Sequence, residues 1–208
     1  MKSIITRMCV TGLLLLSGLA QASEEVTVKY QTCAACHGAQ GECNAALNAP
    51  ALAGQGTAYL ERQLQHFKTG VRGSDPADSL GAQMKPMAAP LSDEDIAQMA
   101  AYLSGLPLPA ATVPASGDLR NGNNYYQSKC GACHGGKAEG NAGLNSPRLA
   151  GLDAAYIKRQ YLNFQQGLRG THADDRYGKQ MKMMSTSLPG DKDLDDVIAY
   201  IQALAAAS

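Results

Sequence analysis

Apolar side chains recur at helical spacing in four segments of the chain, two in each half. In residues 57–69 one face carries Tyr59, Leu60, Gln63, Leu64 and Phe67. Thr57 can cap this helix and Gly70 can end it. A second helix is predicted to start at Ser92, because the acidic residues after it suit a helix N-terminus. Its apolar stripe consists of Ile96, Met99, Ala100 and Leu103.

The second half of the chain repeats this pattern in residues 155–166 and 193–204, and no segment alternates with period two. Gly-, Pro- and Asn-rich stretches lie before the first of these helices and between the first and the second, and we expect residues 38–56 and 70–91 to be loops. Loops of about 20 residues are uncommon inside a compact domain. They are reasonable if they wrap a bulky cofactor. The pattern therefore predicts an all-α protein whose loops enclose a prosthetic group.

The sequence repeats itself at an offset of 97 residues. An ungapped comparison of residues 33–91 with residues 130–188 gives 29 identities in 59 pairs, which chance does not produce. The period is too long for a solenoid repeat and indicates two homologous domains. A Pro-rich stretch between them cannot continue a helix, so we place a linker at residues 105–117. The predicted domains are residues 23–104 and 118–208.

The N-terminus has the pattern of a secretory signal peptide. Lys2 and Arg7 precede a short apolar run, and Ala20-Gln21-Ala22 fits the small-x-small cleavage pattern. We therefore expect residues 1–22 to be removed and the mature chain to lie in the periplasm. No apolar run reaches the ~18 residues of a membrane span, although peripheral membrane association remains open.

Composition narrows the function further. The chain has 18 basic and 18 acidic residues and a pI near 6.9, which argues against a nucleic-acid binder. Hydrophobic residues make up 45% but aromatic residues only 5%. Two small cores built mainly from Ala, Leu and Met leave room for a prosthetic group.

The candidate chemistry lies in two Cys-x-x-Cys-His motifs, Cys33–His37 and Cys130–His134. Two thiols at this spacing can reach the vinyl groups of one haem, and the adjacent His can bind the iron, so the motif is typical of c-type haem attachment. A thioredoxin-like pair would need a βαβ context, and a zinc site would need a fourth ligand. A plain disulfide would leave the His without a role. We therefore predict two covalent haem c groups, held by Cys33, Cys36, Cys130 and Cys133, with His37 and His134 as axial ligands.

The second axial ligand should occur in both halves. His66, His172 and Cys43 are not duplicated, whereas two pairs of methionines are: Met84 with Met181, and Met87 with Met184. A thioether is a plausible ligand for haem iron and raises the reduction potential. Both pairs lie in the predicted loop before the last helix of each domain. The repeat therefore predicts Met ligation by one of these pairs, and we favour Met84 with Met181.

The chain resembles the dihaem cytochrome c4 family over essentially its whole mature length. The resemblance rests on the two haem motifs, on Pro50–Gln55 with its echo Pro147–Gly151, and on the Met-x-x-Met segment that begins at Met84. It implies two class I cytochrome c domains that face each other across a pseudo-two-fold axis. It also implies that Met84 and Met181 bind iron, and that the carbonyls of Pro50 and Pro147 hold the Nδ1–H of the axial His.

Several residues are not assigned by the resemblance. Met183 adds a third Met to the second segment, and the roles of Cys43 and His66 stay open. The duplicated Arg72 and Arg169 can bind haem propionates or be solvated on a loop. Tyr59 and Tyr156 can line the haem crevice or pack between helices.

The resemblance implies a one-electron carrier, not an enzyme, because His/Met ligation leaves no open coordination position. Expected partners are a cytochrome bc complex, a membrane oxidase or a dehydrogenase. One alternative is a dihaem subunit of a dehydrogenase such as a flavocytochrome c sulfide dehydrogenase. Another is a thiosulfate dehydrogenase that uses a Cys ligand, for which Cys43 is the only candidate.

Overall fold

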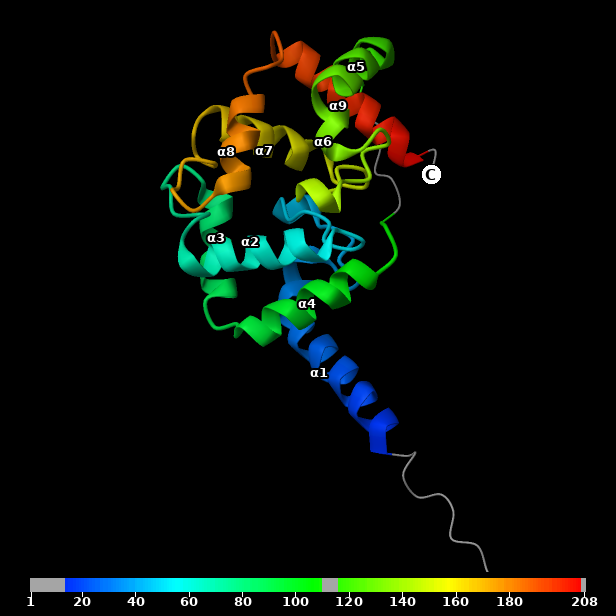
Figure 1. The fold of residues 1–208 in the computed structure, drawn as a ribbon, viewed down its shortest axis with the longest axis vertical. Coiled ribbons are helices and arrows are strands. Elements are labelled where there is room, and N and C mark those ends of the chain that lie inside the picture. Colours follow the sequence, from blue (N-terminus) through cyan, green and yellow to red (C-terminus); the bar gives the residue numbers. More distant parts are fainter. Residues whose placement is uncertain (1–13, 110–115, 207–208) are drawn as a thin grey trace, which may run out of the picture.

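The structure is a computed structural model that describes residues 14–109 and 116–206. It is built from helices joined by loops (Figure 1). The helices of the first half are α1 (Leu14–His37), α2 (Thr57–Thr69), α3 (Ser79–Ala88) and α4 (Asp93–Gly105). Those of the second half are α5 (Leu119–Tyr125), a π-helical turn (Tyr126–Cys130), α6 (Gly131–His134), α7 (Ala154–Gln165), α8 (Arg176–Met184) and α9 (Asp191–Ala206).

The two halves have the same order of elements. The continuous helical segment from α5 to α6 corresponds to the end of α1, and each ends at the His of a Cys-x-x-Cys-His motif. A short 3-10 turn follows in each half, Ala45–Leu47 and Ala142–Leu144. Within the described ranges β-pairing is limited to isolated bridges, Asn44 with Ala49 and Asn141 with Ser146. The prediction of an all-α fold is confirmed.

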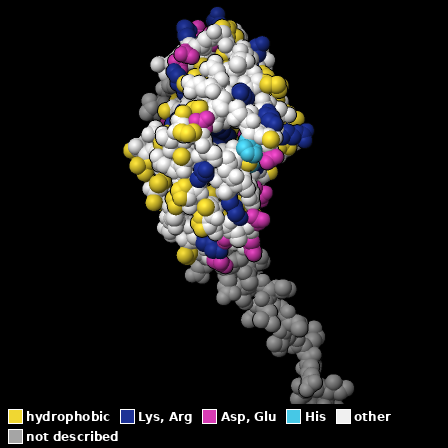
Figure 2. All heavy atoms as spheres, turned by 90° about the vertical axis from the view of Figure 1, so that its left-hand side faces the viewer, with side chains coloured by type: hydrophobic (Ala, Val, Ile, Leu, Met, Phe, Trp, Pro, Cys, Tyr) yellow, Lys and Arg dark blue, Asp and Glu magenta, His cyan; other side chains and the backbone are white. Residues whose placement is uncertain are grey.

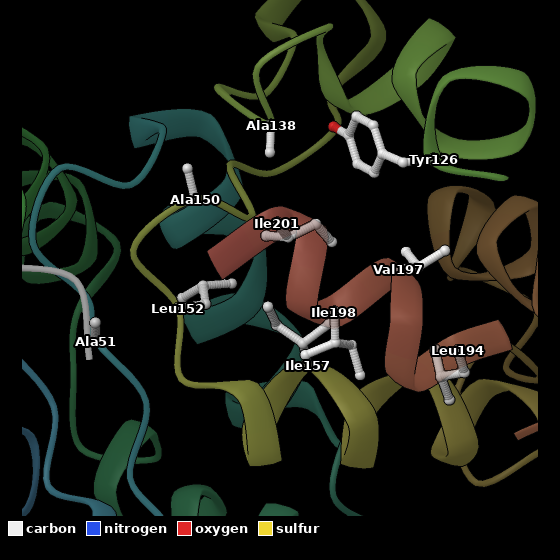
Figure 3. Packing of buried hydrophobic residues seen from close by; sticks show 10 residues of the cluster. All are labelled: Ala51, Tyr126, Ala138, Ala150, Leu152, Ile157, Leu194, Val197, Ile198 and Ile201. Atoms are coloured by element: carbon white, nitrogen blue, oxygen red, sulfur yellow. The ribbon is translucent and has the colours of Figure 1, made fainter. Parts of the chain in front are cut away.

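Two apolar clusters are buried, one within the first half and one centred on the second half that also includes Ala51 of the first. The first cluster consists of Val26, Tyr30, Leu60, Met99, Ala100 and Leu103. The second is larger and is drawn in Figure 3, where side chains of α9 meet Ile157 of α7. The hydroxyls of the fully buried Tyr30 and Tyr126 donate hydrogen bonds to the carbonyls of Gly38 and Gly135, at 2.7 Å and 2.6 Å. These bonds fix the turn that follows each haem motif.

Helix ends follow local chemistry. Ser92 caps α4 with a capping box, in which its side chain accepts from Asp95 N and the Asp95 side chain accepts from Ser92 N. Gly70 ends α2 in the left-handed conformation, with φ of 78°. The prediction that Thr57 caps α2 is wrong. Thr57 is the first helical residue and Gly56 is the N-cap, without a side-chain hydrogen bond.

The expectation that residues 70–91 form a loop is also wrong. They contain α3, and the repeat contains α8. Both helices start where an aspartate accepts a backbone hydrogen bond three residues on: Asp78 from Gly81 N, and Asp175 from Gly178 N. The signal was weak because α3 is short and contains Gly81 and Pro86, both poor helix formers. Met84 and Met181 therefore project from helices.

The two ends of the predicted domain scheme fall partly outside the described residues. Residues 1–13 of the predicted signal peptide are not described, and residues 14–22 form the beginning of α1, which extends away from the body in Figure 1. Cleavage after Ala22 stays a prediction. Of the predicted linker, residues 110–115 are likewise outside the description. No helix in the described ranges is long and apolar enough to cross a membrane.

Some hydrogen bonds between the halves occur twice, between residues that are related by the 97-residue offset of the sequence repeat. Arg62 donates to Asn145 O at 2.8 Å, and Arg159, its counterpart, donates to Asn48 O at 2.8 Å. Residues related by 97 positions thus make the same contact in both directions across the junction. This reciprocity is the pattern expected of a pseudo-two-fold axis.

Candidate functional site

The two Cys-x-x-Cys-His motifs occupy equivalent helix ends. His37 is the last residue of α1 and His134 the last of α6. Cys36 and Cys133 are exposed, whereas Cys33 and Cys130 are half-buried. Burial raises the pKa of Cys33, and burial together with the neighbouring Cys133 raises the pKa of Cys130 to about 11. A redox-active thiol pair needs a lowered pKa. The motifs are therefore unlike those of a disulfide oxidoreductase.

Both imidazoles are oriented by a backbone carbonyl. His37 Nδ1 lies 2.8 Å from Pro50 O, and His134 Nδ1 lies 2.9 Å from Pro147 O. A carbonyl can only accept, so each Nδ1 carries the proton and each Nε2 keeps a free lone pair. Burial lowers the pKa of His37 and of His134 despite these hydrogen bonds. Each imidazole is thus neutral and suited to bind a metal through Nε2. These are the two carbonyl contacts that the family resemblance implied.

A cavity lies beside each motif, and each cavity has an imidazole and a thioether on its wall. The first cavity is lined by Cys33, His37, Pro50 and Met84, together with Leu52, Leu60, Leu64, Phe67, Leu80, Met99 and Leu103. The second is lined by Cys130, Cys133, His134, Pro147 and Met181, together with Leu149, Ile157, Phe164, Leu188, Leu194, Val197, Ile198 and Ile201. The lining of both is largely apolar, as the face of a macrocycle requires.

The methionines of each Met-x-x-Met segment differ in position. Met84 lines the first cavity and Met181 the second. Met87 is not among the residues that line either cavity, and 44% of its surface is exposed. Met184 lines the second cavity but is 40% exposed, and Met183 is 70% exposed. Met84 and Met181 are thus half-buried methionines that line a cavity, and Met184 is a more exposed neighbour of the second cavity.

Five residues line both cavities at once and form the shared wall. They are Tyr59, Gln63, Leu152, Tyr156 and Gln160. The two tyrosines therefore line both cavities, which is the first of the two roles considered for them. Sequence reasoning missed the two glutamines, although Gln63 had been placed on the apolar face of its helix. Their duplication at the repeat offset is the signal that could have found them.

Arg72 and Arg169 are buried beside this wall, at 8% and 7% exposure, so the alternative of solvated loop arginines is wrong. Each guanidinium stacks on a phenylalanine of its own domain, Arg72 on Phe67 and Arg169 on Phe164. The Nε of each has no hydrogen-bond partner. A buried cation with an unpaired donor needs an anion. The unpaired donors, the apolar lining and the His and Met groups fit a haem with its propionate carboxylates in each cavity.

His66 and Cys43 lie outside both cavity linings. His66 Nδ1 is 3.8 Å from Asp175 Oδ1 across the junction. Its repeat counterpart Asn163 donates to Asp78 Oδ1 at 3.3 Å, so each domain contacts the aspartate that caps the other domain's Met-bearing helix. Cys43 packs against the second apolar cluster with φ of 100°. Cys43 lines neither cavity, whereas Met84 lines the first.

Comparison with known proteins gives one consistent result. The family model "Cytochrome c" matches residues 24–107 and again residues 119–205. The chain is 34% identical to cytochrome c4 of Azotobacter vinelandii over 98% of this chain and 99% of the relative. It is 35% identical to a thiosulfate dehydrogenase electron acceptor of Stutzerimonas stutzeri over 89% and 90%. The crystal structure of reduced recombinant cytochrome c4 from Pseudomonas stutzeri superposes with a TM-score of 0.69 and 31% identity, covering 86% of this chain and 97% of that one.

Proposed function

Because the chain belongs to the cytochrome c family and to its two-domain cytochrome c4 branch, we propose that it relays single electrons between respiratory complexes in the periplasm. The chain is a dihaem c-type cytochrome, an electron-transfer protein with one covalent haem c in each domain. The observation that carries the proposal is that two cavities, each with an imidazole and a thioether, share one wall.

We assign the haem-binding residues by domain. Cys33 and Cys36 would attach the first haem, and His37 and Met84 would bind its iron. Cys130 and Cys133 would attach the second haem, and His134 and Met181 would bind its iron. When bound, each haem supplies an iron that accepts and releases one electron.

The side chains around each cavity favour electron transfer over substrate chemistry. Pro50 O and Pro147 O keep each ligating imidazole in one tautomer and one orientation. The thioethers of Met84 and Met181 would supply each iron with a second protein ligand, which would leave no place for a substrate. The apolar lining excludes water, and a fixed set of ligands needs little rearrangement when the charge changes. Such a site can exchange electrons quickly.

The location and the physiological partners belong to the proposal. The basic, apolar and small-residue segments of residues 1–22 support export to the periplasm. A cytochrome bc complex as donor and a membrane oxidase as acceptor suit a carrier with high-potential His/Met haems.

A second candidate function has a specific observation in its favour. The 35% identical relative from Stutzerimonas stutzeri is described as a thiosulfate dehydrogenase electron acceptor. In that role the chain would take electrons from a dehydrogenase and pass them on, with the same haem sites.

The test combines composition and electron exchange. Denaturing mass spectrometry of the exported protein should give the mass of residues 23–208 plus two haems. In stopped-flow experiments the reduced protein should be oxidised by membranes that contain a terminal oxidase, and a cytochrome bc complex should reduce it again. Faster reduction by a thiosulfate dehydrogenase than by the bc complex would favour the second candidate. Steady-state turnover of thiosulfate, sulfide or peroxide by the pure protein would overturn both.

A further inference from the structure

The junction between the domains holds a ring of four polar side chains. Gln63 Oε1 accepts from Arg72 Nη1 at 2.7 Å and from Arg169 Nη2 at 3.0 Å. Gln160 Oε1 accepts from Arg169 Nη1 at 2.6 Å and from Arg72 Nη2 at 3.0 Å. Each glutamine therefore bridges the guanidinium of its own domain and that of the other domain. The ring has the same reciprocity as the sequence repeat.

The ring holds two like charges together without neutralising them. Neither guanidinium forms a salt bridge to a carboxylate within the described part of the chain. A glutamine carbonyl is a neutral acceptor, so it can orient a guanidinium but cannot cancel its charge. Burying an uncompensated cation is costly. The two guanidiniums are therefore suited to bind an anionic group. The Nε of each Arg is buried and has no hydrogen-bond partner, so it can donate to such a group.

The ring is also part of the wall between the two cofactor cavities. Gln63 and Gln160 line both cavities, whereas Arg72 lines the first and Arg169 the second. Moving one glutamine therefore releases a bond to the Arg at each cavity. A positive charge held near a haem favours the added electron and raises its reduction potential.

We propose that Gln63 and Gln160 are positioning residues that tie the guanidinium at one haem to the guanidinium at the other, so that each glutamine controls both reduction potentials. This inference rests on the proposed function, because it takes one haem in each cavity as given. A coupling of this kind is reciprocal, so Gln63 and Gln160 should act alike on both haems.

The test uses the full haem-loaded protein and reads each potential separately. A redox titration is followed through the paramagnetically shifted haem methyl resonances, which differ between the two haems. In Gln63→Leu and in Gln160→Leu the freed guanidiniums turn toward water, and both potentials fall. The expected size is a tenfold change in each one-electron equilibrium, which corresponds to about 59 mV. The double variant should fall by less than the sum of the single variants, because both act on the same ring.

Gln65→Leu is the matched control. Gln65 lies on the same helix two positions on, donates to Asp93 at 3.0 Å and lines neither cavity. It should leave both potentials unchanged. If Gln63→Leu does not fold, Gln63→Glu keeps an acceptor for both guanidiniums and adds a negative charge, so both potentials should fall in a folded protein.

Three results would overturn the inference: a shift confined to the haem of the substituted domain, no shift in either Leu variant, or an equal shift in the Gln65 control. Each of them can be observed in a protein that binds two haems and transfers electrons normally. Failure of the inference is therefore distinguishable from failure of the proposed carrier function, which would appear as missing haem or missing electron exchange.

Discussion

At the scale of single residues, the axial assignment separates two methionines three positions apart on α3. Met84 lines the first cavity, whereas Met87 is 44% exposed. Met84→Ala should abolish the Met–iron charge-transfer absorption of one haem and let that haem bind carbon monoxide, because the sixth position opens. Absorption spectroscopy of the oxidised protein, followed by carbon monoxide titration of the reduced protein, measures both effects.

Met87→Ala is the control for this experiment and should leave both charge-transfer bands in place. The pair Met181 and Met184 should behave in the same way in the second domain. If Met87→Ala or Met184→Ala opens a haem while Met84→Ala and Met181→Ala do not, the ligand assignment is wrong.

The half-buried His66 at the junction between the domains should make the stability of the protein sensitive to acid. Burial lowers its pKa despite the neighbouring carboxylate of Asp175, and Arg62, Arg169 and Arg72 lower it further. The unfolded chain therefore binds this proton more readily than the native protein, and stability should decrease as the pH falls below about 6.5. His66→Asn, which copies Asn163 of the repeat, should remove that part of the decrease. Denaturant unfolding of the haem-loaded protein at pH 5 and pH 8 measures it.

The converse substitution Asn163→His supplies the comparison. It places an imidazole opposite Asp78 and should make the protein more acid-sensitive than the wild type. Identical pH profiles for the wild type and His66→Asn would show that this histidine does not titrate between the two states in the way its burial implies.

At the scale of elements, the Met-bearing helices lie unusually close to the loops before them. Gly170 has φ of 75°, and a Cβ there would overlap the carbonyl oxygen of Gly178 in α8. Gly170→Ala should therefore strain the backbone and push α8 away, with a loss of at least about 2 kcal/mol of unfolding free energy. Because α8 carries Met181, its charge-transfer band should weaken as well. Thermal unfolding and absorption spectroscopy test the two effects.

Gly73→Ala is the equivalent change in the first domain, where the Cβ would meet Gly81 O. Gly105→Ala is the control, since nothing lies within 4 Å of its Cβ and its φ is not positive. A Gly170→Ala protein as stable as the Gly105→Ala protein would contradict the close approach.

The helices differ in how well the sequence predicts them. α2 and α4 have long apolar stripes, and α4 also has a capping box, so both were expected with nearly correct bounds. α3 and α8 were missed because they are held by an aspartate cap and by tertiary contacts, which local pattern does not reveal. The candidate ligands could still be found, because duplication marks a residue even when its secondary structure is misjudged.

At the scale of the whole molecule, the repeat predicts two similar domains but not how they meet. The reciprocal hydrogen bonds of Arg62 and Arg159 join residues far apart in sequence, and no spacing of residues in the sequence predicts them. The same is true of the ring formed by Gln63 and Gln160. The duplication of a polar residue on an apolar helix face was the sign in the sequence that pointed to these glutamines. The same duplication would also be expected if each glutamine formed hydrogen bonds only within its own domain.

Charge is distributed unequally between the two domains. Residues 23–104 contain five basic and nine acidic residues, whereas residues 118–208 contain eleven basic and nine acidic residues. On the face shown in Figure 2, basic side chains extend from the top to the bottom of the body, and acidic side chains lie near the top and along the lower right edge. The two domains should therefore attract partners of opposite charge.

Lys129 makes this asymmetry testable. It is exposed, lines the second cavity beside Cys130, and stands where the first domain has Thr32. Lys129→Glu should slow electron exchange with an acidic redox protein roughly tenfold at low ionic strength, because it repels the partner at the haem edge. The slowing should become smaller at high salt, because the Debye length, beyond which charges are screened, falls to about 3 Å at 1 M ionic strength. Stopped-flow rates across a salt series measure it.

Thr32→Glu places the same carboxylate at the equivalent position of the first domain, with a charge change of one unit instead of two. It should leave these rates nearly unchanged, since the acidic partner docks elsewhere; equal slowing by both variants would mean that the second domain is not the preferred docking site.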